Sequence, residues 1–330
     1  MKAKPVEINW HPGLPIFARE SFLKAVGDEY GWLGGFSDNG ALRCILPYTI
    51  IRKAIFRMVR FRVETIPLGE GLDIQDEKLF LRNAVEYFRS LGADMVIPGS
   101  NNAIFSTYPD GANAAPYGSY VIDLGQTQDV LWKNIDRITR QNIKTAIKKG
   151  VSVRSGSEYL DRAYVLVRDT FKRSKLSFMS LTSFKKFVNG LGEYGKIMIA
   201  DCQGVAQSYV LFAFSEYCAY AVYAGNIVGQ INGENKLLYW EAIRQFKELG
   251  IRLYDFMGAR VNPKPGSKQE ALSLFKRRFG ATLKQGYIWK YPIHPMKYRL
   301  YCLAARLRSG GDLVDAEHHK LRSSSTVETE

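Results

Sequence analysis

A lysine at the border of an apolar helix face is the side chain in this sequence best suited to stabilise a developing negative charge. Residues 272–280 read LSLFKRRFG, and helical spacing places Leu272, Phe275 and Phe279 on one face with Lys276 beside them. Packing can hold such a lysine while its ammonium reaches into a cleft and stabilises an oxyanion. In the alternative interpretation, Lys276 is a surface lysine whose stem lies along the helix and whose charge stays in water.

A second group of basic side chains recurs with helical spacing in residues 128–149. On a continuous helix these side chains form one stripe, which can neutralise successive phosphates of a nucleic acid. An ordinary solvated helix face is the alternative. The net charge of +14 favours a polyanionic partner or an anionic membrane face without choosing between them. The stripe consists of Lys133, Arg137, Arg140, Lys144 and Lys148.

Several enzyme classes are excluded by what the sequence lacks. It has only four histidines, and it contains no HExxH, no Cys/His cluster, no G-x-S-x-G elbow and no Walker A sequence. We therefore expect no metal and no cofactor. The four cysteines are scattered, and the N-terminus has no apolar core of a signal peptide, so we expect a cytoplasmic protein. The cysteines are Cys44, Cys202, Cys218 and Cys302.

The chain contains an internal duplication. Residues 78–92 (KLFLRNAVEYFRSLG) and 236–250 (KLLYWEAIRQFKELG) are identical at six positions, and Gly71 matches Gly229 at the same offset. Each copy predicts a strand, a glycine turn, an amphipathic helix that ends at a glycine, and a second strand. Chance similarity between two amphipathic helices is the alternative. The repeat predicts an α/β (α+β) fold built from two similar halves.

The remaining elements are predicted to fit these halves. We expect strands at 41–51, 61–66, 117–124, 196–201, 205–214, 217–224, 252–257 and 286–290, and helices at 76–91 and 234–249. The predicted organisation is a first domain at 1–150 with a helical hairpin or bent helix at 128–149, and a second domain at 151–292. A terminal helix at 293–308 follows, and the polar segment 309–330 is predicted to be disordered. The terminal helix either docks on the protein or makes peripheral contact with the inner membrane face.

These segments together resemble the FemABX family. The resemblance covers about residues 60–290 and is carried by five motifs. FemABX enzymes have two GNAT-like domains and transfer amino acids from aminoacyl-tRNA to the peptide of a peptidoglycan precursor. The resemblance therefore implies two tandem GNAT-like domains, each a mixed central sheet flanked by helices. The motifs are IKTAIKKGV at 143–151, YAGN at 223–226, LLYWEA at 237–242, GIRLYDFMG at 250–258 and FKRRFG at 275–280.

The resemblance assigns roles to individual residues. Lys276 matches the family lysine whose cation lies near the reacting ester, and Phe275 helps to shape the channel. Tyr223 matches the tyrosine that contacts the acceptor, and we expect Asn226 and Arg260 to contact substrate as well. Arg277 joins the basic stripe as a predicted tRNA contact. Ser180 and Phe184 stand where members that act on the UDP-linked precursor carry Arg and Tyr, and Ile97-Pro98 replaces Asp-Pro.

The implied chemistry needs a neutral amine and stabilisation of an oxyanion. A lysine-type amine has an ordinary pKa near 10.4, so desolvation or a neighbouring carboxylate must help to remove its proton. We name Asp255 as the candidate catalytic carboxylate, with Glu241 or the substrate itself as other sources. A structural hydrogen-bonding role for Asp255 fits the sequence equally well. Lys276 is predicted to stabilise the oxyanion or the leaving ribose oxygen.

Two other functions stay open at this point. The first is a GNAT-type N-acyltransferase that uses acyl-CoA in exopolysaccharide or cell-envelope biosynthesis, although the expected [QR]-x-x-G-x-[GA] pyrophosphate loop is absent from both turns. The second is a non-catalytic nucleic-acid-binding protein. The preferred prediction is an aminoacyltransferase that forms an amide on a peptidoglycan precursor or a related peptide or envelope acceptor.

Overall fold

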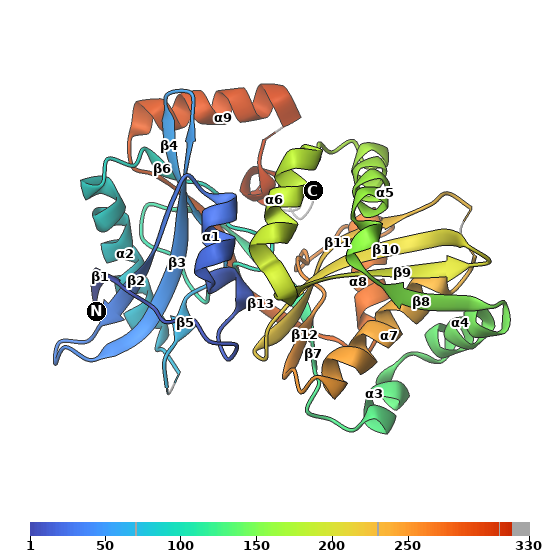
Figure 1. Cartoon of the computed structure of the whole chain (residues 1–330). Coiled ribbons are helices and arrows are strands. Elements are labelled where there is room, and N and C mark those ends of the chain that lie inside the picture. Colours follow the sequence, from blue (N-terminus) through green and yellow to red (C-terminus); the bar gives the residue numbers. More distant parts are fainter. Residues whose placement is uncertain (70, 230, 310, 319–330) are drawn as a thin grey trace, which may run out of the picture.

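The computed structural model describes residues 1–69, 71–229, 231–309 and 311–318. The first half of the chain forms antiparallel strands, a helix that crosses back over them, and further strands (Figure 1). Its elements are β1 (Lys2–Val6), α1 (Glu20–Val26), β2 (Glu29–Phe36), β3 (Leu42–Lys53), β4 (Phe56–Phe61), β5 (Ile66–Pro67), α2 (Ile74–Ser90), β6 (Met95–Val96), β7 (Asn113–Asp123), α3 (Gln128–Asn134) and α4 (Arg137–Lys148).

The second half repeats this order with longer helices before its central strands. Its elements are β8 (Val151–Ser155), α5 (Leu160–Arg173), α6 (Leu181–Leu191), β9 (Gly195–Cys202), β10 (Val205–Phe214), β11 (Cys218–Asn226), α7 (Glu234–Glu248), β12 (Leu253–Asp255), α8 (Lys268–Arg277), β13 (Thr282–Pro292) and α9 (Pro295–Ser309).

The two halves have the same topology and exchange their last strands. In each half three antiparallel strands lead through a helix to a parallel strand, with β2-β3-β4-α2-β6 matching β9-β10-β11-α7-β12. Strand β7 of the first half then pairs with β12, and β13 of the second half pairs with β6. Because β7 and β13 also pair with each other, one sheet runs through both halves. The predicted α/β duplication is confirmed.

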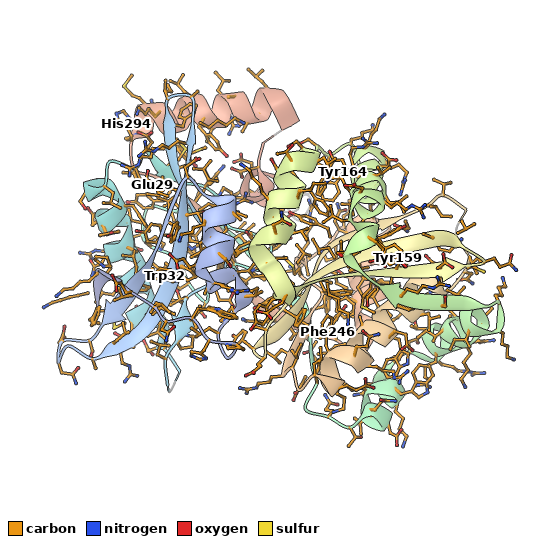
Figure 2. All side chains as sticks on the ribbon, in the orientation of Figure 1. Glu29, Trp32, Tyr159, Tyr164, Phe246 and His294 are labelled. Atoms are coloured by element: carbon orange, nitrogen blue, oxygen red, sulfur yellow. The ribbon has the colours of Figure 1, made fainter. Side chains whose placement is uncertain are left out.

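The helices α2 and α7 form where the repeat predicts them. The Asp73 side chain caps α2 by accepting a hydrogen bond from the backbone N–H of Gln75, which satisfies a free donor at the helix start. Both helices are followed by a glycine in the left-handed conformation, Gly92 (φ 72°) and Gly250 (φ 75°), as glycine favours. Phe88 and Phe246 are fully buried at matching positions. Figure 2 labels Phe246 in the second half and Trp32 in the first.

Several sequence predictions of elements differ from the structure. The strand predicted at 61–66 is split, because β4 ends at Phe61 and the short β5 begins at Ile66. Residues 128–149, predicted as a helical hairpin or a bent helix, form two separate helices, since Ile135 is extended and Asp136 caps α4. Strands β1 and β2 and helices α1, α5 and α6 were not predicted, because they lie outside the internal repeat; α5 and α6 do have an apolar face with helical spacing.

The helices α3 and α4 pack in the second half. Leu131 and Ile143 belong to the same buried cluster as Leu237 and Phe246 of α7, and Figure 1 places both helices at the outer edge of that half. Strand β7 contributes to this cluster as well. The predicted domain boundary at residue 150 stays a prediction, although Tyr120, Leu131 and Ile143, which precede it, all pack in the core of the second half.

The C-terminal segment is more ordered than the sequence predicts. The predicted terminal helix corresponds to α9, whose Tyr298 and Tyr301 pack near Met95 and Phe56 while Leu300 and Leu307 are exposed. Part of the segment predicted as a disordered tail, 311–318, is docked by the fully buried Val314. Residues 319–330 of that prediction lie outside the described residues. Among the described helices, none has the length and apolar composition to cross a membrane, and peripheral membrane contact stays a prediction.

Helices α1 and α6 bring the two halves together on one side of the sheet. Gly190 in the last turn of α6 lies against α1, where an added Cβ would be 2.5 Å from Cβ of Ala25 and 3.3 Å from Cα of Phe22. The Ser21 hydroxyl donates to the Gly190 carbonyl oxygen at 3.0 Å. Glycine is therefore required here by close approach of two backbones.

We expect Gly190→Ala to reduce the free energy of unfolding by about 1–3 kcal/mol through overpacking. In a solvent-exposed helix the same change would raise stability by roughly 1 kcal/mol. The sign of the change in the free energy of unfolding therefore distinguishes close packing from ordinary helix propensity. Urea unfolding measures the effect, with the exposed Thr182→Ala on the same helix as control. A Gly190→Ala protein at least as stable as the parent would contradict the described contact.

Candidate functional site

The site is organised by a left-handed turn that follows strand β12. Met257 (φ 52°) and Gly258 (φ 46°) are both in the left-handed region, which a residue such as methionine rarely adopts. Backbone hydrogen bonds to β7 fix both sides of the turn, from Phe256 N–H to Tyr120 O (2.9 Å) and between Ala259 and Gly118 in both directions. Such a conformation persists only where its surroundings hold it, and it is common at functional sites.

Lys276 donates hydrogen bonds to this turn from helix α8. Its ammonium contacts the carbonyl oxygen of Met257 and, at 2.6 Å, the carbonyl oxygen of Gly258. Burial lowers the pKa of Lys276 to about 8, and the nearby Asp255 carboxylate opposes this shift. Lys276 is therefore held in the interior by two carbonyl dipoles, and the interpretation of a lysine whose charge stays in water is not supported.

Asp255 is fixed on the other side of the same turn. Its carboxylate accepts hydrogen bonds from the Ser119 hydroxyl and, at 2.6 Å, from the backbone N–H of Met257. Burial raises the pKa of Asp255, which these two donors oppose. Because Met257 is bonded to Asp255 through its N–H and to Lys276 through its carbonyl, the two predicted catalytic residues contact the same turn residue.

A cavity of about 950 Å³ lies between the two halves, and Met257 forms part of its wall. Its lining comes from α1 and β4 of the first half and from α6 and β11 of the second. A volume of this size accommodates a small organic molecule. Tyr223, the predicted acceptor contact, lines the cavity on its second-half side.

A β-bulge directs Tyr223 toward this cavity. Tyr223 pairs with Leu211 and Ala221 pairs with Phe212, so Val222 is the extra residue in β11. Bulges of this kind change the direction of a neighbouring side chain and are frequent beside active sites. Aromatic rings surround Tyr223, with centroids of Phe178 at 5.1 Å and Phe187 at 5.6 Å. Burial raises the pKa of its phenol.

Two cavity residues that the sequence analysis did not select are Arg60 and Arg62. Arg60 lies in β4, and Arg62 lies in the bend that follows the end of this strand at Phe61. The only local signal in the sequence is their spacing, since side chains two positions apart share a face on an extended segment. The strand predicted at 61–66 includes Arg62 but begins after Arg60.

Other predicted substrate contacts lie outside the cavity. Phe275 packs in the second core, with its ring 5.2 Å from that of Phe279. Arg260 forms an ion pair with Glu317 of the C-terminal segment at 2.7 Å. The carbonyl of Asn226 accepts a hydrogen bond from Arg173 at 2.7 Å, at the far end of β11. The structure does not bring these three residues together at one site, and their roles in substrate binding stay predictions.

The predicted basic stripe is divided between two helices. Lys133 lies on α3, while Arg137, Lys144 and Lys148 are exposed on α4. Arg140 is instead partly buried, and it donates to the carbonyl oxygens of Lys133 (2.7 Å) and Ile135 (2.6 Å) at the end of α3. Arg140 thus joins the two helices, because free C-terminal carbonyls attract a cation. Arg277, on α8, is exposed. Contact with tRNA stays a prediction.

Comparison with known proteins gives one family match and a group of structural matches. Residues 106–207 match the FemAB family. No curated protein sequence matches the chain. The crystal structure of FemX has a TM-score of 0.66 at 13% identity, covering 91% of this chain and 99% of FemX.

Two further solved structures are similar to this chain. The C-terminal domain of a putative synthetase from Agrobacterium fabrum has a TM-score of 0.53 at 13% identity, covering 90% of this chain and 96% of that one. The L-PGS structure from Bacillus licheniformis has a TM-score of 0.51 at 12% identity, covering 85% and 90%. The structural matches confirm the predicted fold of two GNAT-like halves. The family match confirms the predicted FemABX resemblance and the predicted enzyme class, an acyltransferase.

The lowered pKa of Lys276 predicts a pH dependence of stability. Between pH 8 and the ordinary lysine value of 10.5, the unfolded chain binds this proton more tightly than the folded protein does. The contribution of Lys276 to the free energy of unfolding therefore rises with pH across that window. Chemical unfolding at pH 7.5 and pH 9.5 should show the parent gaining stability relative to Lys276→Met. Parallel pH profiles for the two proteins would be inconsistent with a buried, depressed lysine.

Proposed function

We propose that this protein transfers an aminoacyl group from aminoacyl-tRNA to an amine of a peptidoglycan precursor or a related peptide or envelope acceptor. The observation that carries the proposal is the ammonium of Lys276, which is held in the interior by the turn at Met257 and Gly258. The turn also borders the large cavity between the halves. The FemAB family match at 106–207 supports the class of reaction.

The proposed reaction uses an ester that is already activated. The acceptor nitrogen attacks the ester carbonyl carbon, the carbonyl oxygen takes up negative charge, and the bond to the ribose oxygen then breaks. An amide forms, and the proton lost by the amine reaches the departing ribose oxygen. Lys276 stabilises the oxyanion or that leaving oxygen by its charge, a contribution that is large in a site from which water is excluded.

In this proposal Asp255 positions the turn and does not remove the amine proton. Its carboxylate is only 8% exposed and is occupied by the Ser119 hydroxyl and the Met257 N–H. A proton acceptor must reach the amine directly or through one water. Asp255 is absent from the cavity wall, whereas its neighbour Met257 belongs to it. We therefore propose that Asp255, the carboxylate that the sequence suggested for catalysis, holds the turn in place.

The proposed tRNA contacts are the exposed basic residues of α3 and α4 together with Arg277. Lys133, Arg137, Lys144 and Lys148 remain available to bind phosphates, because Arg140 alone is committed to the helix junction. The acyl-CoA alternative predicts release of free CoA, while the proposed reaction releases uncharged tRNA. Incubation with a pool of charged tRNAs and candidate acceptors, followed by mass spectrometry, identifies the amino acid and the product.

Replacing Lys276 with Met should slow aminoacyl transfer by a factor of about 10² to 10³, as removal of one oxyanion donor does in other enzymes. Lys276→Arg keeps the charge and should retain part of the activity. Single-turnover assays with charged tRNA measure the rate, and filter binding checks that tRNA affinity persists. Transfer at the parental rate by a folded Lys276→Met protein would refute the proposed role.

Replacing Lys144 and Lys148 together with Gln should weaken tRNA binding and lower its salt dependence. Each phosphate contact adds about 0.7–0.9 to the slope of log affinity against log salt, so the slope should fall by about 1.5. The matched control replaces the exposed Lys2 and Lys4 of β1 with Gln. Equal effects of the two double substitutions would show that net charge, and not α4, determines the affinity.

A further inference from the structure

The cavity between the halves contains a buried and a partly buried arginine, and neither has an acidic partner among the described residues. Arg62 is 6% exposed and Arg60 is partly buried, and both line the cavity on the first-half side. Within residues 1–69, 71–229, 231–309 and 311–318, no carboxylate lies within salt-bridge distance of either guanidinium. Burial lowers the pKa of Arg62, the neighbouring Arg60 lowers it further, and the Tyr223 phenol opposes the shift.

Neutral groups of the protein hold these guanidiniums in place without compensating their charge. Arg62 donates to the Thr49 hydroxyl at 3.0 Å and to the carbonyl oxygen of Val26. Arg60 leaves its buried Nε without a hydrogen-bond partner. Buried charges are normally paired, since removing a charged group from water is costly. Two adjacent unpaired arginines are therefore a feature that a bound anion would complete.

The other charged residues of the cavity lining are also mostly positive. Lys24 and Lys186 line it as well, and its one carboxylate is Asp28, which accepts a hydrogen bond from the backbone N–H of Arg52 at 2.7 Å. Lys24 is paired with Glu20 on the helix surface at 3.0 Å. The unpaired positive charge near the first half is therefore that of Arg60 and Arg62, at the end of β4.

The opposite wall of the cavity is aromatic. Tyr223, Phe171 and Phe187 line it from the second half, and Met257 adjoins them. The cavity thus receives guanidiniums from the first half and aromatic rings from the second, and Met257 of the Lys276 turn belongs to the same lining. A ligand that fits both walls carries an acidic group and a less polar body.

We propose that Arg60 and Arg62 bind an oxyanion, a phosphoryl or carboxylate group, of the acceptor molecule. Guanidinium groups match either oxyanion through paired N–H donors. The anion would orient the acceptor along the cavity, so that its amine lies on the side of Met257 and Lys276. The identity of the ligand as the acceptor rests on the proposed function, whereas anion binding by the two arginines does not.

Calorimetric titration at low ionic strength tests the site without tRNA. Inorganic diphosphate and glutarate serve as the phosphoryl and carboxylate probes. The parent should bind at least one of them, and Arg60→Gln should weaken that binding at least tenfold. Arg154→Gln, which removes an exposed arginine elsewhere, is the matched control and should bind as the parent does. Preference for diphosphate or for glutarate identifies the class of oxyanion.

Arg60→Gln is the informative variant, because the Arg60 side chain makes no hydrogen bond to a described protein group. The Arg62→Gln substitution would instead remove the hydrogen bonds of Arg62 to Thr49 and Val26. The melting temperature of the ligand-free Arg60→Gln protein should be equal to or above that of the parent, since a buried unpaired charge is removed. Absence of binding of both probes to the parent, or equal binding to Arg60→Gln, would overturn the proposal.

A transfer assay connects this site to the reaction. Arg60→Gln should raise KM for the acceptor at least tenfold while kcat changes less, because the arginine contacts a part of the acceptor remote from the reacting ester. A protein that binds the anion probes through Arg60 but transfers nothing from any charged tRNA would refute the proposed function and leave the anion site standing.

Discussion

The hydrogen bonds between Lys276 and the carbonyls of a left-handed turn are the interaction on which the rest of this site depends. The turn can exist only because its neighbours fix it, with Asp255 binding the Met257 N–H and β7 pairing on both flanks. The same peptide units present their carbonyls to the ammonium. A lysine in this setting keeps its position without a carboxylate in direct contact, so no ion pair neutralises its charge.

The exchange of strands explains why two similar halves form one site. Strand β7 belongs to the first half by sequence, yet it supplies Ser119 to Asp255 and pairs with β12 of the second half. Strand β13 makes the reciprocal connection to β6. The halves are therefore held at a fixed relative position, and the cavity between α1 and α6 has one wall from each. Gly190 permits the close approach of these two helices.

The duplicated helices and the buried position of Lys276 could be predicted from the sequence, because both leave local signals. The repeat at 78–92 and 236–250 has an apolar helical face and a terminal glycine, and the FKRRFG motif places a lysine beside two phenylalanines. The strand exchange could not be predicted, since pairing of β7 with β12 depends on contacts between residues more than a hundred positions apart. The commitment of Arg140 to helix α3 and of Arg260 to Glu317 likewise depends on tertiary geometry. The spacing of Arg60 and Arg62 is visible in the sequence, but the bend after β4 that contains Arg62 is not.

The central claim is that the Lys276 ammonium faces the reacting carbonyl of the aminoacyl group. A crystal structure with a stable RNA mimic, in which an amide replaces the ester that joins the amino acid to the terminal ribose, measures this directly. The account predicts the acyl carbonyl oxygen or the ribose-linked atom at about 2.7–3.1 Å from Nζ of Lys276. An aminoacyl group bound elsewhere, with Lys276 still donating only to Met257 and Gly258, would contradict it.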